Sequence, residues 1–435
     1  MQLPNLAVAL TQPLYAFEEQ LLRQREEIEI WFNQQWDAFP PPLYGSVDLR
    51  NAGFKLAPVD MNLFPAGFNN LNPQLLSSSI AAAQKVIRHW VPQAKRILII
   101  PENHTRNLFY WESIHTLQRI LEHSGFQVRI GFLLEELTVP STIALSSGAM
   151  VTIEPLRREQ EHVFVDGFIP DFILLNNDLA DGVPTILQGL TQVFYPPAEL
   201  GWHQRLKSEH FQYYAEMGQL FAEKMQIDPW AITPLFRHCG NIDFMRQEGL
   251  ECLLFHAEAL LADINKKYQE YAIPHKPFLI IKADAGTYGM AVMTVRSLDD
   301  LQHLNREQRK RMASTKGNQP VRRVILQEGV YSFETYGTEQ AVAEPVVYLW
   351  GGCVVGGFYR VHQARGIDES LNAPGAHFKP LAFSHSCDAP EVSSSPQASS
   401  NLLYAYGIVA RLSMLAAARE VAQQSRKALW QSDSV

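Results

Sequence analysis

Apolar and polar positions follow two periods along the chain, and each period predicts its own kind of element. Helical spacing of apolar residues, every three or four positions, predicts helices. They are expected at 11–36, 72–95, 108–123, 202–226, 248–271, 298–313 and 402–423. Short apolar runs bounded by turn residues predict strands at 96–100, 126–133, 150–153, 163–168 and 171–175. Residues 43–72 are dense in Gly, Pro and Asn and are predicted to form a long ordered loop.

The order of these elements predicts a chain of three parts. Strands alternate with helices over residues 75–200, which is typical of an α/β layer with a mainly parallel sheet. The chain is strand-rich from 278 to 361. We therefore expect domains at 1–200, 201–330 and 331–435, the last with a Ser-rich mobile loop at 384–400 and a C-terminal helix.

Composition and charge exclude some classes of partner. The 435 residues are 46% hydrophobic and 19% charged, as in an ordinary globular protein. With 37 Lys and Arg against 45 Asp and Glu, the net charge is −8, a poor match for nucleic acid or an anionic membrane.

The same features predict where the protein works. We read no signal peptide and no membrane helix. The four cysteines are widely spaced and form no zinc pattern; four cysteines in a chain of this length, with no secretory signal, fit a reducing cytoplasm. We expect small molecules as partners. The sequence leaves open whether the protein forms a homo-oligomer.

The segment FLIIKADAGTYGM, residues 278–290, is the strongest chemical signal. An apolar strand ends in Lys282, and a small-residue loop follows that includes Gly286, Thr287, Tyr288 and Gly289. Glycines let backbone N–H groups approach a phosphate, and a lysine supplies a positive charge for it. The segment matches neither a P-loop nor a dinucleotide fingerprint.

Two further segments add ligands suited to a nucleotide. The strand RRVILQEGV ends in Gln327, Glu328, Gly329 and Val330, a stretch that can read an adenine edge. Either Glu328 or Glu334 can hold ribose hydroxyls. A predicted hairpin from Tyr348 to Tyr359 then delivers Arg360, a group suited to a transferring phosphoryl. Nearby oxygen ligands suited to Mg²⁺ are Glu344, Glu369 and Asn372.

This order of motifs resembles the ATP-grasp superfamily. The segments FLIIKADAGTYGMAVM and DESLNAPGAHFKPL look more specifically like the proteobacterial ATP-grasp glutamate–cysteine ligases. The resemblance implies a Rossmann-like N-terminal domain followed by a two-subdomain ATP-grasp fold, α/β and α+β in class. It implies ligation of the glutamate γ-carboxylate to cysteine through an acyl-phosphate, with ATP and two Mg²⁺. Lys282 and Arg360 would act on the phosphates, and Lys207, Lys224 and Lys266 stay open as the second ATP lysine.

Polar clusters near the N-terminus are candidates for the amino-acid site. One, in residues 46–70, offers Asp48, Arg50, Lys55, Asp60 and Asn62. The other follows the strand at 96–100 and offers Glu102, Asn103 and Arg106, at the kind of strand end where α/β sheets bind ligands. Loop 176–178 has the same geometry and a weaker case.

Two alternatives remain at this stage. The first is another ATP-grasp ligase, such as a glutathione synthetase. The second is a non-catalytic ATP-binding regulatory protein, against which the joint presence of Arg360, Glu344, Glu369 and Asn372 argues.

Overall fold

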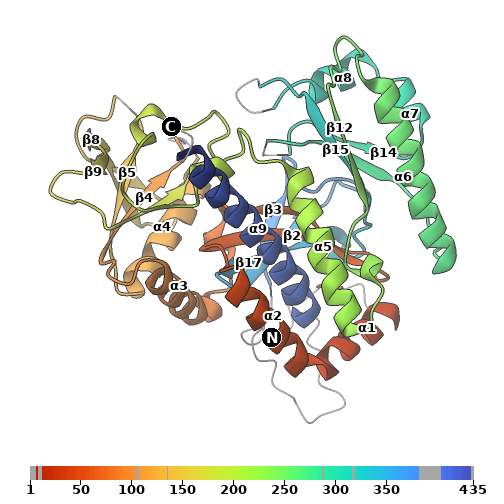
Figure 1. Ribbon diagram of the computed structural model, residues 1–435, viewed down its shortest axis with the longest axis horizontal. Helices are drawn as coiled ribbons and strands as arrows, with labels where there is room; N and C mark the ends of the chain where they lie inside the picture. The colour runs from red at the N-terminus through yellow and green to blue at the C-terminus, as the bar shows by residue number, and fades with distance from the viewer. Residues whose placement is uncertain are drawn as a thin grey trace.

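The fold combines helices with three main sheets (Figure 1). The structure, a computed structural model, describes residues 6–7, 12–103, 107–134, 136–286, 289–315, 319–381 and 403–432. Its helices are α1 Gln12–Arg23, α2 Arg25–Ala38, α3 Leu76–Trp90, α4 Leu108–His123, α5 Lys207–Met225, α6 Leu250–Glu270, α7 Asp299–Gln302, α8 Arg306–Met312 and α9 Leu403–Ser432. No described helix has the length and apolar character needed to cross a membrane.

The largest sheet among the described residues is antiparallel and has seven strands. Its strands are β1 Leu6–Ala7, β2 Tyr44–Asn51, β3 Leu56–Asn62, β16 Thr335–Tyr336, β17 Ala341–Trp350, β18 Cys353–His362 and β19 His377–Pro380. Strand β17 lies at its centre, paired with β18 on one side and with β2 and β16 on the other. Helices α9 and α5 pack side by side, and α9 lies against β2, β3 and β17 (Figure 1).

A six-stranded sheet forms the predicted α/β layer. In spatial order its strands are β11 Phe194–Tyr195, β10 Phe172–Asn176, β4 Arg96–Pro101, β5 Gln127–Phe132, β7 Met150–Pro155 and β6 Ser141–Ala144. All its pairings are parallel except that of β6 with β7. Parallel strands are usually buried and strongly apolar, and four of the five side chains of β10 are indeed apolar and buried.

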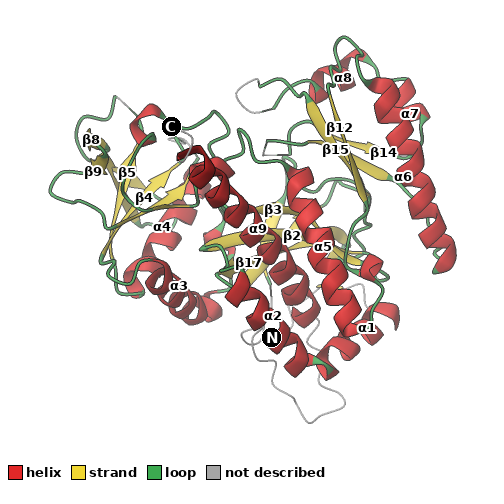
Figure 2. Ribbon diagram, in the orientation of Figure 1, coloured by secondary structure: helices red, strands yellow, loops and turns green. Residues whose placement is uncertain are grey.

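A four-stranded antiparallel sheet carries the lysine strand. Its order is β12 Phe236–Gly240, β15 Arg323–Glu328, β13 Leu279–Ala283 and β14 Val292–Val295. Helix α6 covers one of its faces, with Leu253, Ala257 and Leu260 in the shared core. Figure 2 shows this sheet and the six-stranded sheet on opposite sides of the seven-stranded one. A short ribbon, β8 Arg157–Glu159 with β9 His162–Phe164, forms a separate two-stranded sheet.

The prediction of a loop over 43–72 was wrong, because these residues contain β2 and β3. Their Gly, Pro and Asn content argued against strands, but β2 finds a partner in β17, about 300 positions away along the chain. Long-range pairing and burial outweigh weak local β-propensity.

Several helix predictions also needed correction. The helix predicted over 11–36 divides into α1 and α2, and the one over 298–313 divides into α7 and α8. The helix predicted from 202 begins at Lys207. The predicted hairpin at the glycine pair is confirmed as β17 and β18, whereas loop 384–400 lies outside the described residues.

The predicted class, a mixture of helices with parallel and antiparallel sheets, is confirmed. The division at residues 200 and 330 stays a prediction. The seven-stranded sheet takes β2 and β3 from the first predicted range and β16 to β19 from the last. The first and third ranges therefore share a sheet.

Candidate active site

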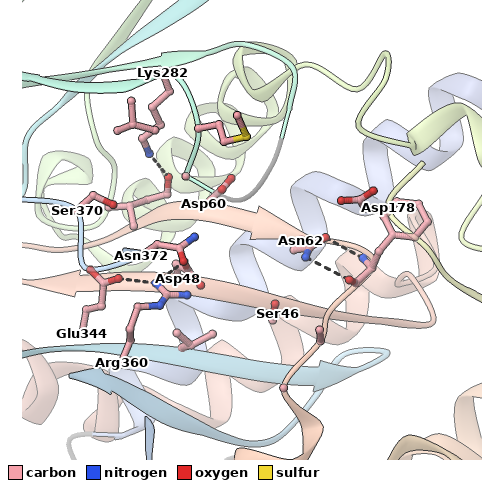
Figure 3. A pocket seen from close by; sticks show the side chains of 18 of the residues that line it. Ser46, Asp48, Asp60, Asn62, Asp178, Lys282, Glu344, Arg360, Ser370 and Asn372 are labelled. Atoms are coloured by element: carbon pink, nitrogen blue, oxygen red, sulfur yellow. Dashed lines mark hydrogen bonds and ion pairs between the residues drawn. The ribbon is translucent and has the colours of Figure 1, made fainter. Parts of the chain in front are cut away.

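A cavity of about 430 Å³ lies where the three sheets meet, within the size range of small-molecule sites. One wall is a face of the seven-stranded sheet, another is the four-stranded sheet, and the end of the six-stranded sheet closes a third side. Figure 3 shows Lys282 and Asp60 at one end, Asp178 and Asn62 at another, and Arg360 with Glu344 and Asp48 on the floor.

The charged floor follows from strand alternation. Side chains two residues apart on a strand point to the same face, so Asp48 and Arg50 share a face, as do Glu344 and Val346. The intervening residues, including Val47 and Leu49, face the apolar core beneath α9. A sequence with alternating charged and apolar positions thus builds a polar cavity wall and a buried core from the same strands.

Two arginines hold Glu344 on this floor. Arg50 Nε lies 3.2 Å from Glu344 Oε2, and Arg360 Nη1 donates to Glu344 Oε1. The same Nη1 atom lies 2.9 Å from Asp48 Oδ2. Burial alone would lower the pKa of Arg360, but Asp48 and Glu344 outweigh it and raise the pKa. Burial raises the pKa of Asp48 in spite of the opposing Arg360 charge.

Lys282 bridges two sheets at one end of the cavity. Its Nζ donates to Val59 O at 2.7 Å and to Gln327 Oε1 at 2.9 Å. Burial lowers the pKa of Lys282 to about 8, with Asp60 acting in the opposite direction. An anion bound beside this ammonium would raise the pKa of Lys282 back toward its ordinary value.

A second lysine lies beside the first. Lys207 Nζ donates to both oxygens of Asp60, at 2.9 and 3.0 Å, and lies 3.8 Å from the ring centroid of Trp202. Burial would raise the pKa of Asp60, but Lys207 and Lys282 hold it below its ordinary value. This end of the cavity thus combines two ammonium groups with one carboxylate.

Gln327 offers a buried donor next to these lysines. Its Oε1 accepts from Lys282, which leaves Nε2 buried without a hydrogen-bond partner among the described residues. An unpaired buried donor costs free energy and calls for an explanation. An acceptor atom on a bound ligand would satisfy it.

The six-stranded sheet supplies polar groups from its strand ends. Glu102 follows β4 and Asp178 follows β10, and both line the cavity with Asn107 and Tyr110. Tyr110 Oη donates to Asn176 O and accepts from the Glu102 N–H, both at 2.8 Å, which ties the two strand ends together. Polar residues that follow β4 and β10 therefore meet at the cavity, at the strand ends where α/β sheets commonly bind ligands.

Most of the residues predicted from the sequence meet in this cavity. Those that line it are Asp48, Arg50, Asp60, Asn62, Glu102, Lys282, Gly286, Gly289, Gln327, Glu328, Val330, Glu344, Arg360 and Asn372. Those described but absent from its lining are Lys55, Asn103, Gly329, Glu334 and Glu369. Thr287, Tyr288 and Arg106 lie outside the described residues.

Two of the absent residues are committed to protein partners. Lys55 Nζ lies 2.7 Å from Glu328 Oε2 and 2.9 Å from Thr233 O, with its side chain only 1% exposed. The Glu334 carboxylate accepts from Asn51 Nδ2 at 3.1 Å and from Tyr406 Oη. These contacts give both side chains a structural explanation.

Glu328, Gly329 and Glu369 also differ from the expectation. Glu328 borders the cavity, but its carboxylate accepts from Lys55, Trp230 Nε1 and Leu235 N. A Cβ on Gly329 would lie 2.2 Å from the Phe278 ring, so close packing explains this glycine. The Glu369 side chain accepts from Gly366 N at 2.8 Å, in its own turn.

Several residues that line the cavity had a weak signal in the sequence or none. Lys207 was one of three open candidates, and Asp178 was placed in a loop with a weaker case. Trp202, Ser46 and Tyr110 had no role assigned. An alternating polar pattern in Ser46, Asp48 and Arg50 could have revealed the strand.

Comparison with known proteins decides the family. A family model described as glutamate–cysteine ligase matches residues 18–421. The chain belongs to the glutamate–cysteine ligase family. It is therefore an enzyme of the ligase class, and the alternative of a non-catalytic regulatory protein is set aside.

One solved structure with high sequence identity agrees with this family. The chain is 50% identical to a Methylobacillus flagellatus KT protein provisionally named gamma-glutamylcysteine synthetase, covering 98% of this chain and 100% of that one with a TM-score of 0.89. A D-alanyl-alanine synthetase A from Vibrio cholerae also matches, with 10% identity, 74% and 81% coverage and a TM-score of 0.33. A glutathione synthetase-like effector from Globodera pallida matches with 11% identity, 80% and 77% coverage and a TM-score of 0.35. A comparison with curated proteins finds no match.

Proposed function

We propose that this glutamate–cysteine ligase uses ATP and Mg²⁺ to join the γ-carboxylate of L-glutamate to the amine of L-cysteine. The reaction would proceed through a γ-glutamyl phosphate and give γ-glutamylcysteine, ADP and phosphate. The observation that carries the proposal is the cavity itself, in which two arginines and two lysines surround a small polar space at the junction of three sheets.

The lysine end is suited to the triphosphate. Lys282 and Lys207 supply positive charge, and Gly286 and Gly289, which carry no side chain, allow a phosphate to approach the backbone closely. Of the three lysines left open by the sequence, Lys224 and Lys266 are exposed and do not line the cavity, whereas Lys207 lines it. We therefore take Lys207 as the second ATP lysine.

The buried Gln327 amide is suited to the base. Its Nε2 donor has no partner among the described residues, and an adenine ring offers acceptor nitrogens. Lys282 fixes the orientation of the amide by donating to its Oε1 at 2.9 Å. ATP would then lie between the four-stranded and seven-stranded sheets, in the manner of an ATP-grasp fold.

The chemistry of the floor residues fits Mg²⁺. Asp48, Asp60 and Glu344 offer carboxylate oxygens and Asn372 offers an amide oxygen, which are hard ligands. The raised pKa of Asp48, caused by burial and also by Glu344 and Asp60, reflects negative charge that a cation would offset. Bound Mg²⁺ would neutralise phosphate charge during transfer.

The arginines would steady the reacting groups. A glutamate carboxylate approaching a triphosphate is repelled unless positive charge surrounds both. Arg360 and Arg50 lie on the floor facing the cavity, and the ion pairs with Asp48 and Glu344 hold them in position. Attack by the carboxylate oxygen on the γ-phosphorus releases ADP, and attack by the cysteine amine on the acyl carbon releases phosphate.

The end near the six-stranded sheet would take an amino acid. Glu102 and Asp178 provide carboxylates suited to an α-ammonium, while Asn62 and Asn107 provide amides. Buried Trp202 and Tyr348 add apolar surface that would help to exclude water from a reactive acyl-phosphate.

The testing experiment measures phosphate release from Mg-ATP with glutamate and cysteine supplied separately and together. Release that needs both amino acids, with the mass of γ-glutamylcysteine in the product, supports the proposal. Turnover with the pair in the absence of ATP, or a product linked through the α-carboxylate, would overturn it. Release with a different acid and amine would keep the ATP-dependent ligase and discard the substrates.

A further inference from the structure

Two thiols and an imidazole meet on the four-stranded sheet, outside the active-site cavity. Cys239 lies buried on β12, while Cys252 and His256 lie on α6 and are exposed and half-buried, respectively. The two Sγ atoms are 3.8 Å apart, and a nitrogen of His256 completes a group whose members all lie within 4.8 Å of one another.

The local structure explains why these three side chains converge. Cys252 and His256 are four residues apart on one helix, so they lie one above the other on the same side. Leu253 and Ala257, next to them in the sequence, belong to the buried stripe that packs α6 on the sheet. The edge strand β12 therefore presents Cys239 to the rim of this helix–sheet contact.

The spacing of the sulfur atoms matches a metal site better than a disulfide. A disulfide needs its sulfur atoms about 2.0 Å apart. In a regular tetrahedron with metal–sulfur bonds of about 2.3 Å, the two sulfurs are about 3.8 Å apart. Thiolate and imidazole together form the ligand set of zinc sites, in contrast to the oxygen-rich floor of the cavity.

We propose that Cys239, Cys252 and His256 bind a thiophilic divalent metal ion, with Zn²⁺ as the representative. Both thiols would release their protons to solvent on binding, and the third protein ligand would be a neutral imidazole. The exposed side of Cys252 leaves the fourth position to water. The ion would join the edge strand β12 to helix α6.

This metal site is separate from the active site because the sheet lies between them. Facing residues of paired strands share a side of the sheet, and Phe236 faces Gln327, a cavity residue. Cys239 lies three positions further along β12, opposite Val324, and therefore points to the other side. Cys239, Val324 and Leu326 all belong to the core under α6.

Zinc binding by the reduced, metal-free protein tests the proposal. Zn²⁺ is titrated against a chromophoric chelator in saturating Mg²⁺, so that oxygen-lined sites are occupied. We expect one equivalent per chain with a Kd below about 1 µM, weaker than four-ligand structural sites. Co²⁺ in place of Zn²⁺ should give the intense visible bands of a tetrahedral ion with thiolate charge transfer.

Matched variants identify the ligands. Cys252→Ser and His256→Ala should each raise the Kd at least about tenfold, while Cys353→Ser, on β18, should leave it unchanged. Ligase turnover should be the same in all three, because none of these side chains lines the cavity. The proposal would be overturned if the reduced protein failed to bind Zn²⁺, or if Cys252→Ser and His256→Ala bound Zn²⁺ with the Kd of the wild type. A disulfide between Cys239 and Cys252 under mild oxidant, without zinc binding, would replace it with a redox pair.

Discussion

Replacing Lys55 with methionine separates a structural role from the substrate-binding role that its sequence context predicts. The Lys55–Glu328 pair is 2.7 Å long and both side chains are 1% exposed. Removing one member of such a buried pair leaves an uncompensated charge, at a cost of about 3–5 kcal/mol. Methionine retains most of the apolar stem, so lost packing contributes little.

The structure places the expected effect at the lower end of that range. Trp230 Nε1 and Leu235 N still donate to the Glu328 carboxylate, at 3.0 and 2.9 Å, after the ammonium is gone. We therefore expect the free energy of unfolding to fall by about 3 kcal/mol. A Lys55→Met/Glu328→Gln double variant should recover at least about 1 kcal/mol, because the orphaned charge is removed.

Urea denaturation followed by far-UV circular dichroism measures this effect, with KM for glutamate and cysteine determined in parallel. The control is Lys224→Met, which removes an exposed ion pair with Glu27 whose side chains are 53% and 48% exposed. The control should lie within about 0.5 kcal/mol of wild type. If Lys55→Met unfolded like this control and instead raised the KM of an amino acid, the structural reasoning would be refuted.

Because burial lowers the pKa of Lys282 to about 8, kcat/KM for ATP should fall as pH rises through about 8, and Lys282→Arg should remove that alkaline limb in a pH profile. Burial raises the pKa of Glu334 to about 7. Between the pKa of Glu334 in the unfolded chain and its pKa in the folded chain, the folded state therefore binds more protons. Glu334 contributes stability at low pH, and this contribution is lost as pH rises through about 7. Glu334→Gln should therefore flatten this decline in urea midpoints measured from pH 5 to 8, and an unchanged slope would contradict the assignment. Gly289→Ala should lower kcat/KM about tenfold, since φ is +65° and a Cβ would lie 2.9 Å from Asn372 O, whereas Gly337→Ala, with φ +79° and open space, should keep wild-type kinetics.

Elements whose signal is local were predictable from the sequence. Helix α4 was predicted at 108–123 and is found there, because its apolar spacing and closing Gly125 act within a few residues. The lysine strand, the glycine hairpin and Arg360 were also readable, since each occupies a short motif. The order of these motifs carried the resemblance to the family that the comparison then established.

Tertiary structure alone decided which of the candidate residues meet. Residues 43–72 looked like a loop, yet β2 and β3 complete a sheet around β17 and set Asp48 beside Arg360. The sequence does not distinguish Lys207 from Lys224 and Lys266, and only the fold shows that Lys207 reaches Asp60 at the cavity. Lys55 resembled its polar neighbours in sequence, but in the fold it forms an ion pair with Glu328 on a distant strand. The physical reason is common to all of these: long-range pairing, burial and charge compensation depend on partners that no local window of sequence contains.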